Sequence, residues 1–166
     1  FTSARDGALN LYMRSIDGKN QVQRITTHTP NLNWPHAWSG DGKTLIYVER
    51  NPETGYDIWG LNIDDPDSAA PLLETPVNEN NPVVSGDGKW IAYQSNESGQ
   101  YEIYIHNFPA FDKRWQVSTE GGNQVLWAPD GKTLYYRHGS ELVSVSFQGG
   151  ENPIIGDPKV IIEDDS

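Results

Sequence analysis

The stretch Ser85-Gly86-Asp87-Gly88-Lys89-Trp90-Ile91-Ala92-Tyr93 decides the fold of this chain, because it occurs there three times. Ser39–Tyr47 and Ala128–Tyr136 repeat its pattern, and the aspartates of the three Asp-Gly pairs lie 46 and 43 residues apart. An Asp-Gly pair between an apolar residue and an alternating apolar strand is a strong hairpin signal, since both residue types tolerate left-handed backbone geometry. A repeat of this length predicts an array of similar supersecondary units.

Alignment on this stretch divides the chain into four repeats within one predicted domain that spans residues 1–166. The repeats cover about residues 1–30, 31–76, 77–121 and 122–166, and the first lacks its first strand and most of its second. The third repeat is the most regular, with predicted strands near Pro82–Ser85, Trp90–Ser95, Tyr101–His106 and Trp115–Ser118. The fourth has predicted strands at Val125–Ala128, Thr133–Arg137, Glu141–Phe147 and Lys159–Ile162, and no helix is predicted.

Four antiparallel strands in each repeat predict an all-β fold. Units of this kind are the blades of a β-propeller, and the chain holds about 3.7 of them, as a partial or a four-bladed propeller. The composition agrees, because six Trp, eight Tyr, 16 Gly and 11 Pro suit short aromatic strands joined by frequent turns.

The charge and the absence of cysteine exclude several function classes. A net charge of −11 argues against nucleic-acid binding, which needs clustered Lys and Arg. The absence of cysteine excludes disulfides and thiolate metal sites. No apolar run reaches the roughly 18–20 residues that cross a bilayer, so we expect no membrane insertion in this segment. The chain begins with Phe1 and has no leader, and we therefore expect it to be a piece of a longer protein.

The stretch Asn81–Gly99 resembles the TolB-type propeller repeat, also called the WD40-like β-propeller repeat. That repeat has the form P-x-W-S-P-D-G-K-x-I-A-F-x-S-x-x-x-G-x-x-D-I-Y. The proline of its turn is present at Pro129, whereas Gly40 and Gly86 replace it in the other two copies. The resemblance covers essentially the whole chain and implies a ring that usually closes with six blades. The chain would then be a fragment, a ring completed by another copy or chain, or a small four-bladed variant.

A narrower likeness lies in Glu97–Ile105, followed by Phe108-Pro109, and in Lys113–Gly122. These stretches look like the propeller that follows bacterial serine/threonine kinase domains and some winged-helix regulators. The likeness implies a sensory or docking module of a larger protein, in a periplasmic or secreted location. The kinase sequence signatures are absent from this chain, so the likeness carries over no kinase activity.

The titratable residues form no catalytic or metal-binding pattern. No Gly-x-Ser-x-Gly elbow occurs, and Asp64-Asp65-Pro66-Asp67 lacks the spacing of a calcium loop, which favours a solvated turn. The histidines are scattered without metal-ligand spacing, at His28, His36, His106 and His138. We therefore predict no enzymatic activity, no cofactor and no metal.

One acidic position recurs at the start of the third strand of three repeats, as Asp57, Glu102 and Glu141. Such residues could be paired catalytic carboxylates. Their fixed place in each repeat instead favours a structural hydrogen bond to the neighbouring strand.

The favoured hypothesis is a non-catalytic module that binds a protein or peptide through one rim. Loops between blades, and loops between second and third strands, share that rim in a propeller. Aromatic, amide and His side chains there suit polar recognition with a few anchors. The predicted binding residues are Trp34, His36, Asn78, Asn80, Glu97, Asn123 and His138, with Arg5 on the same rim.

Two alternatives stay open. The chain could be the accessory propeller of an enzyme, either the gating domain of a peptidase or a polysaccharide lyase with a metal in its channel. For the lyase, His36 is the best ligand candidate because it lies between Trp34 and Trp38. The chain could instead be an assembly protein that forms oligomers or filaments, since open edges of blades invite self-association.

Overall fold

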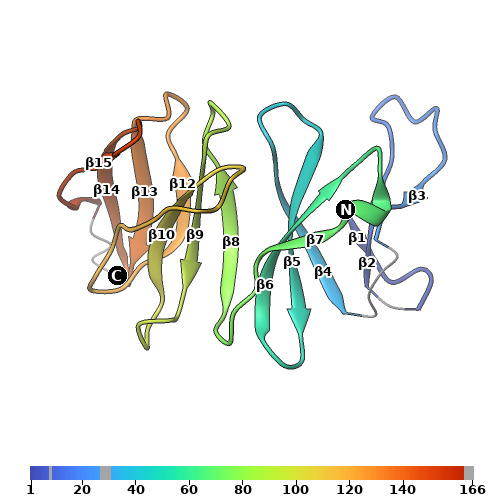
Figure 1. The fold of residues 1–166 in the computed structure, drawn as a ribbon, viewed down its shortest axis with the longest axis horizontal. Coiled ribbons are helices and arrows are strands. Elements are labelled where there is room, and N and C mark those ends of the chain that lie inside the picture. The colour runs from blue at the N-terminus through green and yellow to red at the C-terminus, as the bar shows by residue number, and fades with distance from the viewer. Residues whose placement is uncertain (8, 27–30, 163–166) are drawn as a thin grey trace. The chain divides into compact units, whose positions relative to one another are not determined.

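The computed structural model describes residues 1–7, 9–26 and 31–162, and it divides the chain into two compact units, residues 1–79 and 80–166. Each unit contains two antiparallel sheets (Figure 1). The only helix among the described residues is one turn of 3₁₀ helix, η1 (Pro66–Ser68), inside the predicted polar turn. None of the described helices is long and apolar enough to cross a membrane. The prediction of an all-β fold is confirmed.

Unit 1 holds a three-stranded and a four-stranded sheet. The first has the order β1-β2-β3, and the second has the order β4-β5-β6-β7, with each strand antiparallel to its neighbour. The strands are β1 (Thr2–Ser3), β2 (Asn10–Met13), β3 (Gln23–Arg24), β4 (Leu32–Trp38), β5 (Thr44–Asn51), β6 (Gly55–Asn62) and β7 (Ala70–Leu73). The predicted end of the first repeat, residues 27–30, lies outside the described residues, and with it His28.

Unit 2 holds the two most regular sheets. The first has the order β11-β10-β9-β8, and the second has the order β12-β13-β14-β15, with β16 also paired to β14. The strands are β8 (Glu79–Val84, whose first residue belongs to unit 1), β9 (Trp90–Ser95), β10 (Glu102–Asn107), β11 (Arg114–Gln116), β12 (Asn123–Trp127), β13 (Thr133–His138), β14 (Glu141–Gln148), β15 (Ile154–Ile155) and β16 (Lys159–Ile162). The predictions of Trp90–Ser95 and Lys159–Ile162 match β9 and β16 residue for residue.

The fourth strand of the last sheet differs from the prediction, because two short strands share its place. Ile155 pairs with Phe147, and Val160 pairs with Val143, so β15 and β16 follow one another along β14. The Gly156 N–H still donates to the Ser146 carbonyl at 2.9 Å, and the following Asp157-Pro158 interrupts the ladder because proline has no N–H to donate. The repeat pattern predicts β16 but not β15.

The repeated Asp-Gly stretch forms the turn between the first and second strands of three sheets. The glycine N–H closes the turn by donating to the carbonyl three residues earlier, at 2.9 Å from Gly42 to Ser39 and 2.8 Å from Gly88 to Ser85. Left-handed φ values of 70° fall on Gly42 and Gly88. The aspartate instead contributes its carboxylate, which in Asp87 accepts hydrogen bonds from the Ser85 hydroxyl and the Lys89 N–H. The predicted turn is therefore confirmed. Glycine supplies the left-handed backbone, and aspartate supplies the carboxylate that accepts the hydrogen bonds.

We expect Gly88→Ala to destabilise the protein by about 1 kcal/mol, because a Cβ at the φ of 70° found at Gly88 is strained. Gly86→Ala in the same turn is the matched control. Its φ is not left-handed, and its new Cβ would lie 3.6 Å from the Pro129 carbonyl oxygen, an ordinary contact. Urea denaturation of both variants measures the difference, and equal losses in the two variants would contradict this account of the turn.

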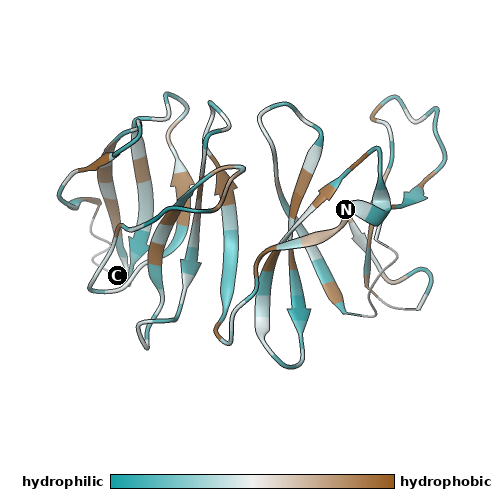
Figure 2. Ribbon diagram, in the orientation of Figure 1, coloured by the Kyte–Doolittle hydropathy of each residue, from teal (hydrophilic) through white to brown (hydrophobic). Residues whose placement is uncertain are grey.

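Hydrophobic residues recur along the strands of both units (Figure 2). They alternate with polar residues along β14, whereas all six residues of β9 are buried. In unit 2 the two sheets pack on each other through one core, which includes Ile103, Ile105, Leu134 and Val145, all fully buried. Its aromatic centre joins Trp90 of β9 to Phe147 of β14. In unit 1 a smaller core joins Leu11 and Ile25 of the first sheet to Leu45, Tyr47 and Leu61 of the second.

Candidate protein-binding rim

The predicted binding residues of unit 2, which are Asn80, Glu97, Asn123 and His138, lie at one end of its strands. In unit 2 the Asp-Gly turns join the first and second strands at one end of the sheets, and the loops β9–β10 and β13–β14 lie at the opposite end (Figure 1). The first strands β8 and β12 begin at that opposite end, because they run toward the Asp-Gly turns. We call this end of unit 2 the amide rim and define it by Asn80, Asn81, Gln94, Asn123 and Gln124.

Two equivalent backbone distortions shape the amide rim. Asn81 and Gln124 both have left-handed backbone geometry, with φ values of 52° and 53°. In β12 the pairing register with β13 shifts between Asn123 and Leu126, which makes Gln124 part of a β-bulge. Left-handed geometry is uncommon in residues other than glycine, although asparagine tolerates it, and it collects at functional sites.

One buried side chain ties the two distortions together. Gln94 of β9 is 7% exposed, and its Oε1 accepts hydrogen bonds from Asn81 Nδ2 at 2.9 Å and from the Gln124 N–H at 3.0 Å. The bridge links the first strands of neighbouring sheets. It therefore holds the preceding residues, Asn80 and Asn123, in matching places on the two strands.

Asn80 leaves one buried polar atom, Oδ1, without a hydrogen-bond partner among the described residues. Buried amide oxygens are normally paired, so such an atom calls for an explanation. Asn123 is half-buried and lies opposite Arg137 in the ladder. These two predicted residues occupy equivalent positions, each one residue before a left-handed residue of a first strand.

His138 joins the same end of unit 2. It follows Arg137 at the end of β13, and its Nδ1 lies 3.2 Å from Glu141 Oε2. Its ring also borders Gly121, since a Cβ built on that glycine would lie 3.4 Å from His138 Cδ2. His138 is thus next to Asn123 but already has a carboxylate partner.

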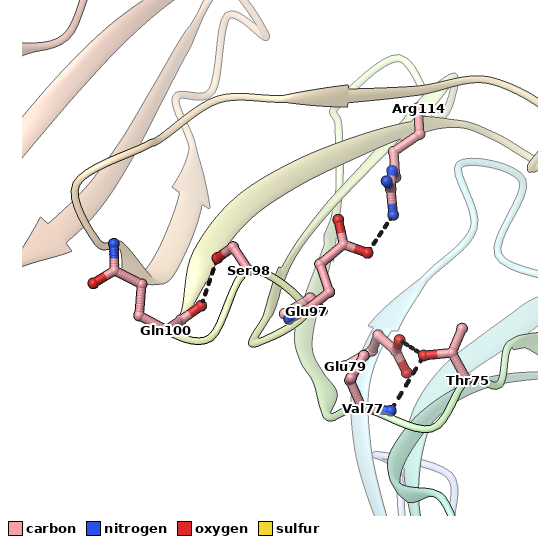
Figure 3. Close-up of polar contacts among 8 residues, drawn as sticks. Thr75, Val77, Glu79, Glu97, Ser98, Gln100 and Arg114 are labelled. Carbon is pink, nitrogen blue, oxygen red and sulfur yellow. Dashed lines mark hydrogen bonds and ion pairs between the residues drawn. The ribbon is translucent and has the colours of Figure 1, made fainter.

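Glu97 lies on the same end but points to an outer strand. Its Oε2 accepts a hydrogen bond from Arg114 Nη1 at 2.6 Å, and the Arg114 guanidinium carbon lies 5.1 Å from the centroid of the Tyr104 ring (Figure 3). The two charged side chains are 31% and 45% exposed, so this ion pair contributes about 0.5 kcal/mol. Glu97 is therefore paired with Arg114 on β11, and it is not one of the residues that define the amide rim.

In unit 1 Trp34 and Asn78 meet through Tyr56. The Trp34 and Tyr56 rings lie 6.0 Å apart between centroids, and Asn78 Oδ1 accepts a hydrogen bond from the Tyr56 N–H at 3.1 Å. Gly55 fits beside this amide because it has no side chain, since a Cβ there would lie 2.5 Å from Asn78 Oδ1. These contacts occupy the Asn78 oxygen within the fold.

His36 and Arg5 lie in other surroundings within unit 1. His36 is exposed and borders a pocket of about 410 Å³ together with Phe1, Tyr12 and Trp38. The Arg5 guanidinium carbon lies 4.7 Å from the Tyr12 ring centroid and 5.3 Å from that of Phe1. Neither residue shares the Trp34 group.

The recurring acidic residues make local structural contacts. Glu102 is 1% exposed, and its carboxylate accepts hydrogen bonds from the Ser118 hydroxyl and from the Gly121 N–H, the latter at 2.8 Å. These partners follow β11, so the predicted bond to the neighbouring strand region is confirmed for Glu102. The Thr54 hydroxyl in the same hairpin donates a hydrogen bond to Asp57 Oδ2 at 2.6 Å. Burial raises the pKa of the Asp57 carboxyl.

A similar bond holds unit 1, between Thr75 and Glu79. The Thr75 hydroxyl donates to Glu79 Oε1 and accepts from the Val77 N–H (Figure 3). Within residues 1–7, 9–26 and 31–162, no group of three or more His, Cys, Asp or Glu side chains is placed to hold a metal ion.

The amide rim contains three residues that the sequence analysis missed, Asn81, Gln94 and Gln124. The repeat alignment held a signal for two of them. Asn80-Asn81 and Asn123-Gln124 are amide pairs at the same distance before the Asp-Gly turn. Amides are rare in strands, so a matched pair at a strand start marks a bulge or a polar site.

No protein-family model matches the chain. An uncharacterised protein of Agrobacterium fabrum is 32% identical over 127 residues, which cover 71% of this chain and 39% of that protein. The Tol-Pal system protein TolB of Francisella tularensis is 23% identical over 131 residues, which cover 78% of this chain and 30% of that protein. The chain thus spans well under half the length of these relatives.

Solved structures agree on the fold. A TolB candidate from Agrobacterium tumefaciens superposes with a TM-score of 0.74 at 19% identity, over 97% of this chain and 59% of that one. TolB from Acinetobacter baumannii gives a TM-score of 0.72 at 21% identity, over 92% of this chain and 37% of that one. The antiparallel four-stranded sheets and the repeated Asp-Gly turns point to the same fold as these superpositions. The chain has the TolB-like β-propeller fold.

Proposed function

We propose that this chain is a non-catalytic propeller module that binds an extended segment of a partner protein at the amide rim. The observation that carries the proposal is the paired distortion at Asn81 and Gln124, joined by Gln94. It sets Asn80 and Asn123 in matching places and leaves the Asn80 oxygen without a partner among the described residues.

Side-chain amides fit this role because they both donate and accept hydrogen bonds. A polypeptide backbone presents the same two groups in alternation, so an amide pair can bind it without a charge. The net charge of −11 favours a neutral or basic partner segment over an acidic one. Arg137 lies opposite Asn123 in the ladder, and His138 with its Glu141 partner follows it at the same end of unit 2.

The likeness to TolB supports a role in protein binding outside the cytoplasm. The Francisella relative is a Tol-Pal system protein, and the solved TolB propellers share the fold of this chain. We therefore place the module in the periplasm or outside the cell, as part of a larger protein.

Peptides selected from a random displayed library against the parent chain test the proposal. We expect the double variant Asn80→Leu, Asn123→Leu to lose about tenfold to a hundredfold in affinity, the effect of removing hydrogen bonds worth about 1–3 kcal/mol. Isothermal titration with the selected peptides measures the loss.

The control variant is Asn152→Leu, which removes an exposed amide from the β14–β15 loop, far along the chain from the rim residues. Its affinity should equal that of the parent. Failure to select any peptide, or peptides that bind the double variant as tightly as the parent, would reject the amide rim as the binding site.

A further inference from the structure

The end of unit 2 that carries the Asp-Gly turns contains a hollow of about 730 Å³, which we call the turn hollow. Residues of both sheets line it, from the β8–β9 turn at Gly86-Asp87, the β12–β13 turn at Pro129–Lys132, the end of β14 and Ile154 of β15. Phe147 of the shared core also borders it, so the hollow opens between the two sheets and not on the outer face of the last one.

The walls of the turn hollow are fixed by contacts within the fold. The Phe147 N–H donates a hydrogen bond to the Lys132 carbonyl at 2.8 Å, which joins the end of β14 to the β12–β13 turn. The two turns also lie against each other, because a Cβ built on Gly86 would be 3.6 Å from the Pro129 carbonyl oxygen. A site with fixed walls loses little conformational entropy when a ligand binds.

Two carboxylates line the hollow, one from each sheet. Asp87 Oδ1 accepts hydrogen bonds from the Ser85 hydroxyl at 2.6 Å and from the Lys89 N–H at 3.1 Å, and Asp130 Oδ1 accepts one from the Lys132 N–H at 2.9 Å. Within the part of the chain that the structure describes, neither Oδ2 accepts a hydrogen bond and neither carboxylate is in an ion pair. Each turn therefore orients its carboxylate and leaves one oxygen available.

The turn at Asp130 lacks one hydrogen bond that the other two turns contain. Ser39 and Ser85 donate their hydroxyls to the aspartate two residues later, whereas Ala128 stands at the same place before Asp130. An ionised carboxylate can accept about four hydrogen bonds. Asp130 thus has more unused capacity for a donor from outside the chain than the aspartates of the other two turns.

The charges and the apolar surface of the hollow favour a basic side chain with an apolar stem. Lys132 is exposed and is the single basic residue among those that line the hollow, so the two aspartates leave it net negative. The chain's charge of −11 adds to this attraction for a cation. Ile154, at 63% exposed, offers apolar surface beside the charges.

Arginine fits this combination better than lysine does. Its guanidinium is a planar fork with five N–H donors, which can reach two carboxylates at once, whereas an ammonium is a compact point charge. Hydrogen bonds between a guanidinium and a carboxylate are also stronger than those between neutral groups. The methylene stem of arginine packs on apolar surface while its charged end stays hydrogen-bonded.

We propose that the turn hollow binds an arginine side chain of a partner protein, with the guanidinium between Asp87 and Asp130 and the stem against Ile154. The turn hollow and the amide rim lie at opposite ends of the strands of unit 2. The inference therefore goes beyond the proposed function and stands or falls separately from it.

NMR titration of the full chain with a capped alanine pentapeptide that carries a central arginine tests the inference. The amide signals of Gly88 and Gly131 should shift and saturate at millimolar peptide. The same peptide with citrulline, which has the shape of arginine without the charge, should bind at least about tenfold more weakly. Asp87→Asn and Asp130→Asn should each weaken the arginine peptide about tenfold, because asparagine keeps the oxygen that the turn needs but loses the charge.

The matched control is Asp41→Asn. Asp41 makes the same contacts in the equivalent turn of unit 1, with Ser39 and Lys43, and it lies outside the turn hollow. The variant loses the same single charge, so it should bind the arginine peptide like the parent. Absence of shifts at Gly88 and Gly131, equal binding of the citrulline peptide, or an equal loss in Asp41→Asn would overturn the inference, since the last result would reflect only the overall charge.

Discussion

Replacement of Phe147 with alanine should lower the free energy of unfolding by about 3–5 kcal/mol, the range for a buried phenylalanine. Phe147 is 4% exposed at the centre of the unit 2 core. Its ring centroid lies 5.1 Å from that of Trp90 and 5.0 Å from that of Trp127, and both contacts are edge-on. The variant removes both contacts and leaves a cavity between the two sheets, and urea denaturation measures the loss.

The rigidity of the surrounding core supports a loss near the upper end of this range. Trp90 also contacts Trp115, at 5.5 Å between ring centroids, and Gly149 packs against the Trp90 indole so closely that a Cβ there would lie 2.9 Å from Nε1. Neighbours held on several sides cannot collapse into the space that Phe147 vacates.

Trp38→Ala is the control for this prediction. Trp38 is also a large aromatic residue on a strand, but it is 46% exposed, so its loss should cost about 1 kcal/mol or less. If Phe147→Ala cost no more than Trp38→Ala, the aromatic centre would not be the main support of unit 2.

The sequence predicted the turns and the strands well because both follow from local rules. An Asp-Gly pair needs only its own backbone freedom and its own carboxylate to form the turn, as the Asp87 contacts show. The short apolar run Trp90–Tyr93, bounded by turn residues, likewise indicates a buried strand without reference to any other part of the chain. Glu102 was predicted to be structural because an acidic residue recurs at its position in three repeats, and a position fixed by the repeat favours a hydrogen bond within the sheet.

The site was less predictable because it depends on contacts between sheets. Gln94 was not predicted, since its partners Asn81 and Gln124 lie 13 and 30 residues away along the chain. Glu97 was assigned to the rim from its loop position, whereas Arg114 on β11 draws it to the outer strand. The break between β15 and β16 was also missed, because an apolar Ile154-Ile155 pair is too short to indicate a strand by alternation.

A buried histidine in unit 2 should make the stability of the protein fall as the pH is lowered from about 6.5 to about 4. His106 of β10 is 7% exposed, and its ring stacks on that of Phe111 with centroids 4.8 Å apart. Burial, and next the positive charge of Arg114, lower the pKa of His106 to about 4, although Glu97 acts in the opposite direction. The folded chain therefore keeps this ring neutral at pH 5.

The direction of the effect follows from the protons bound in each state. An unfolded chain protonates its histidines near pH 6.5, so between that pH and about 4 the unfolded state binds more protons at His106 than the folded state does. Stability is then fully present above about pH 6.5 and declines by up to about 3 kcal/mol as the pH falls to 4. Below that pH the contribution of His106 becomes constant.

Other groups titrate in the same range, so the measurement must isolate His106. The raised pKa of Asp57, for example, favours the folded state as the pH falls. His106→Phe keeps an aromatic ring against Phe111 and Tyr93 but cannot take up a proton. The difference in unfolding free energy between the parent and this variant should be constant above pH 7 and should shift toward the variant by up to about 3 kcal/mol at pH 4.

Urea denaturation of the two proteins at a series of pH values gives this difference directly. Titration of the His106 ring signals by NMR supplies an independent reading, and the midpoint should lie well below that of an unfolded reference peptide. A difference curve that stays flat from pH 7 to pH 4, or a ring that titrates near 6.5 in the folded chain, would show that water reaches His106. The stack on Phe111 would then not shield the ring, and the β10–β11 loop that carries Phe111 would be open in solution.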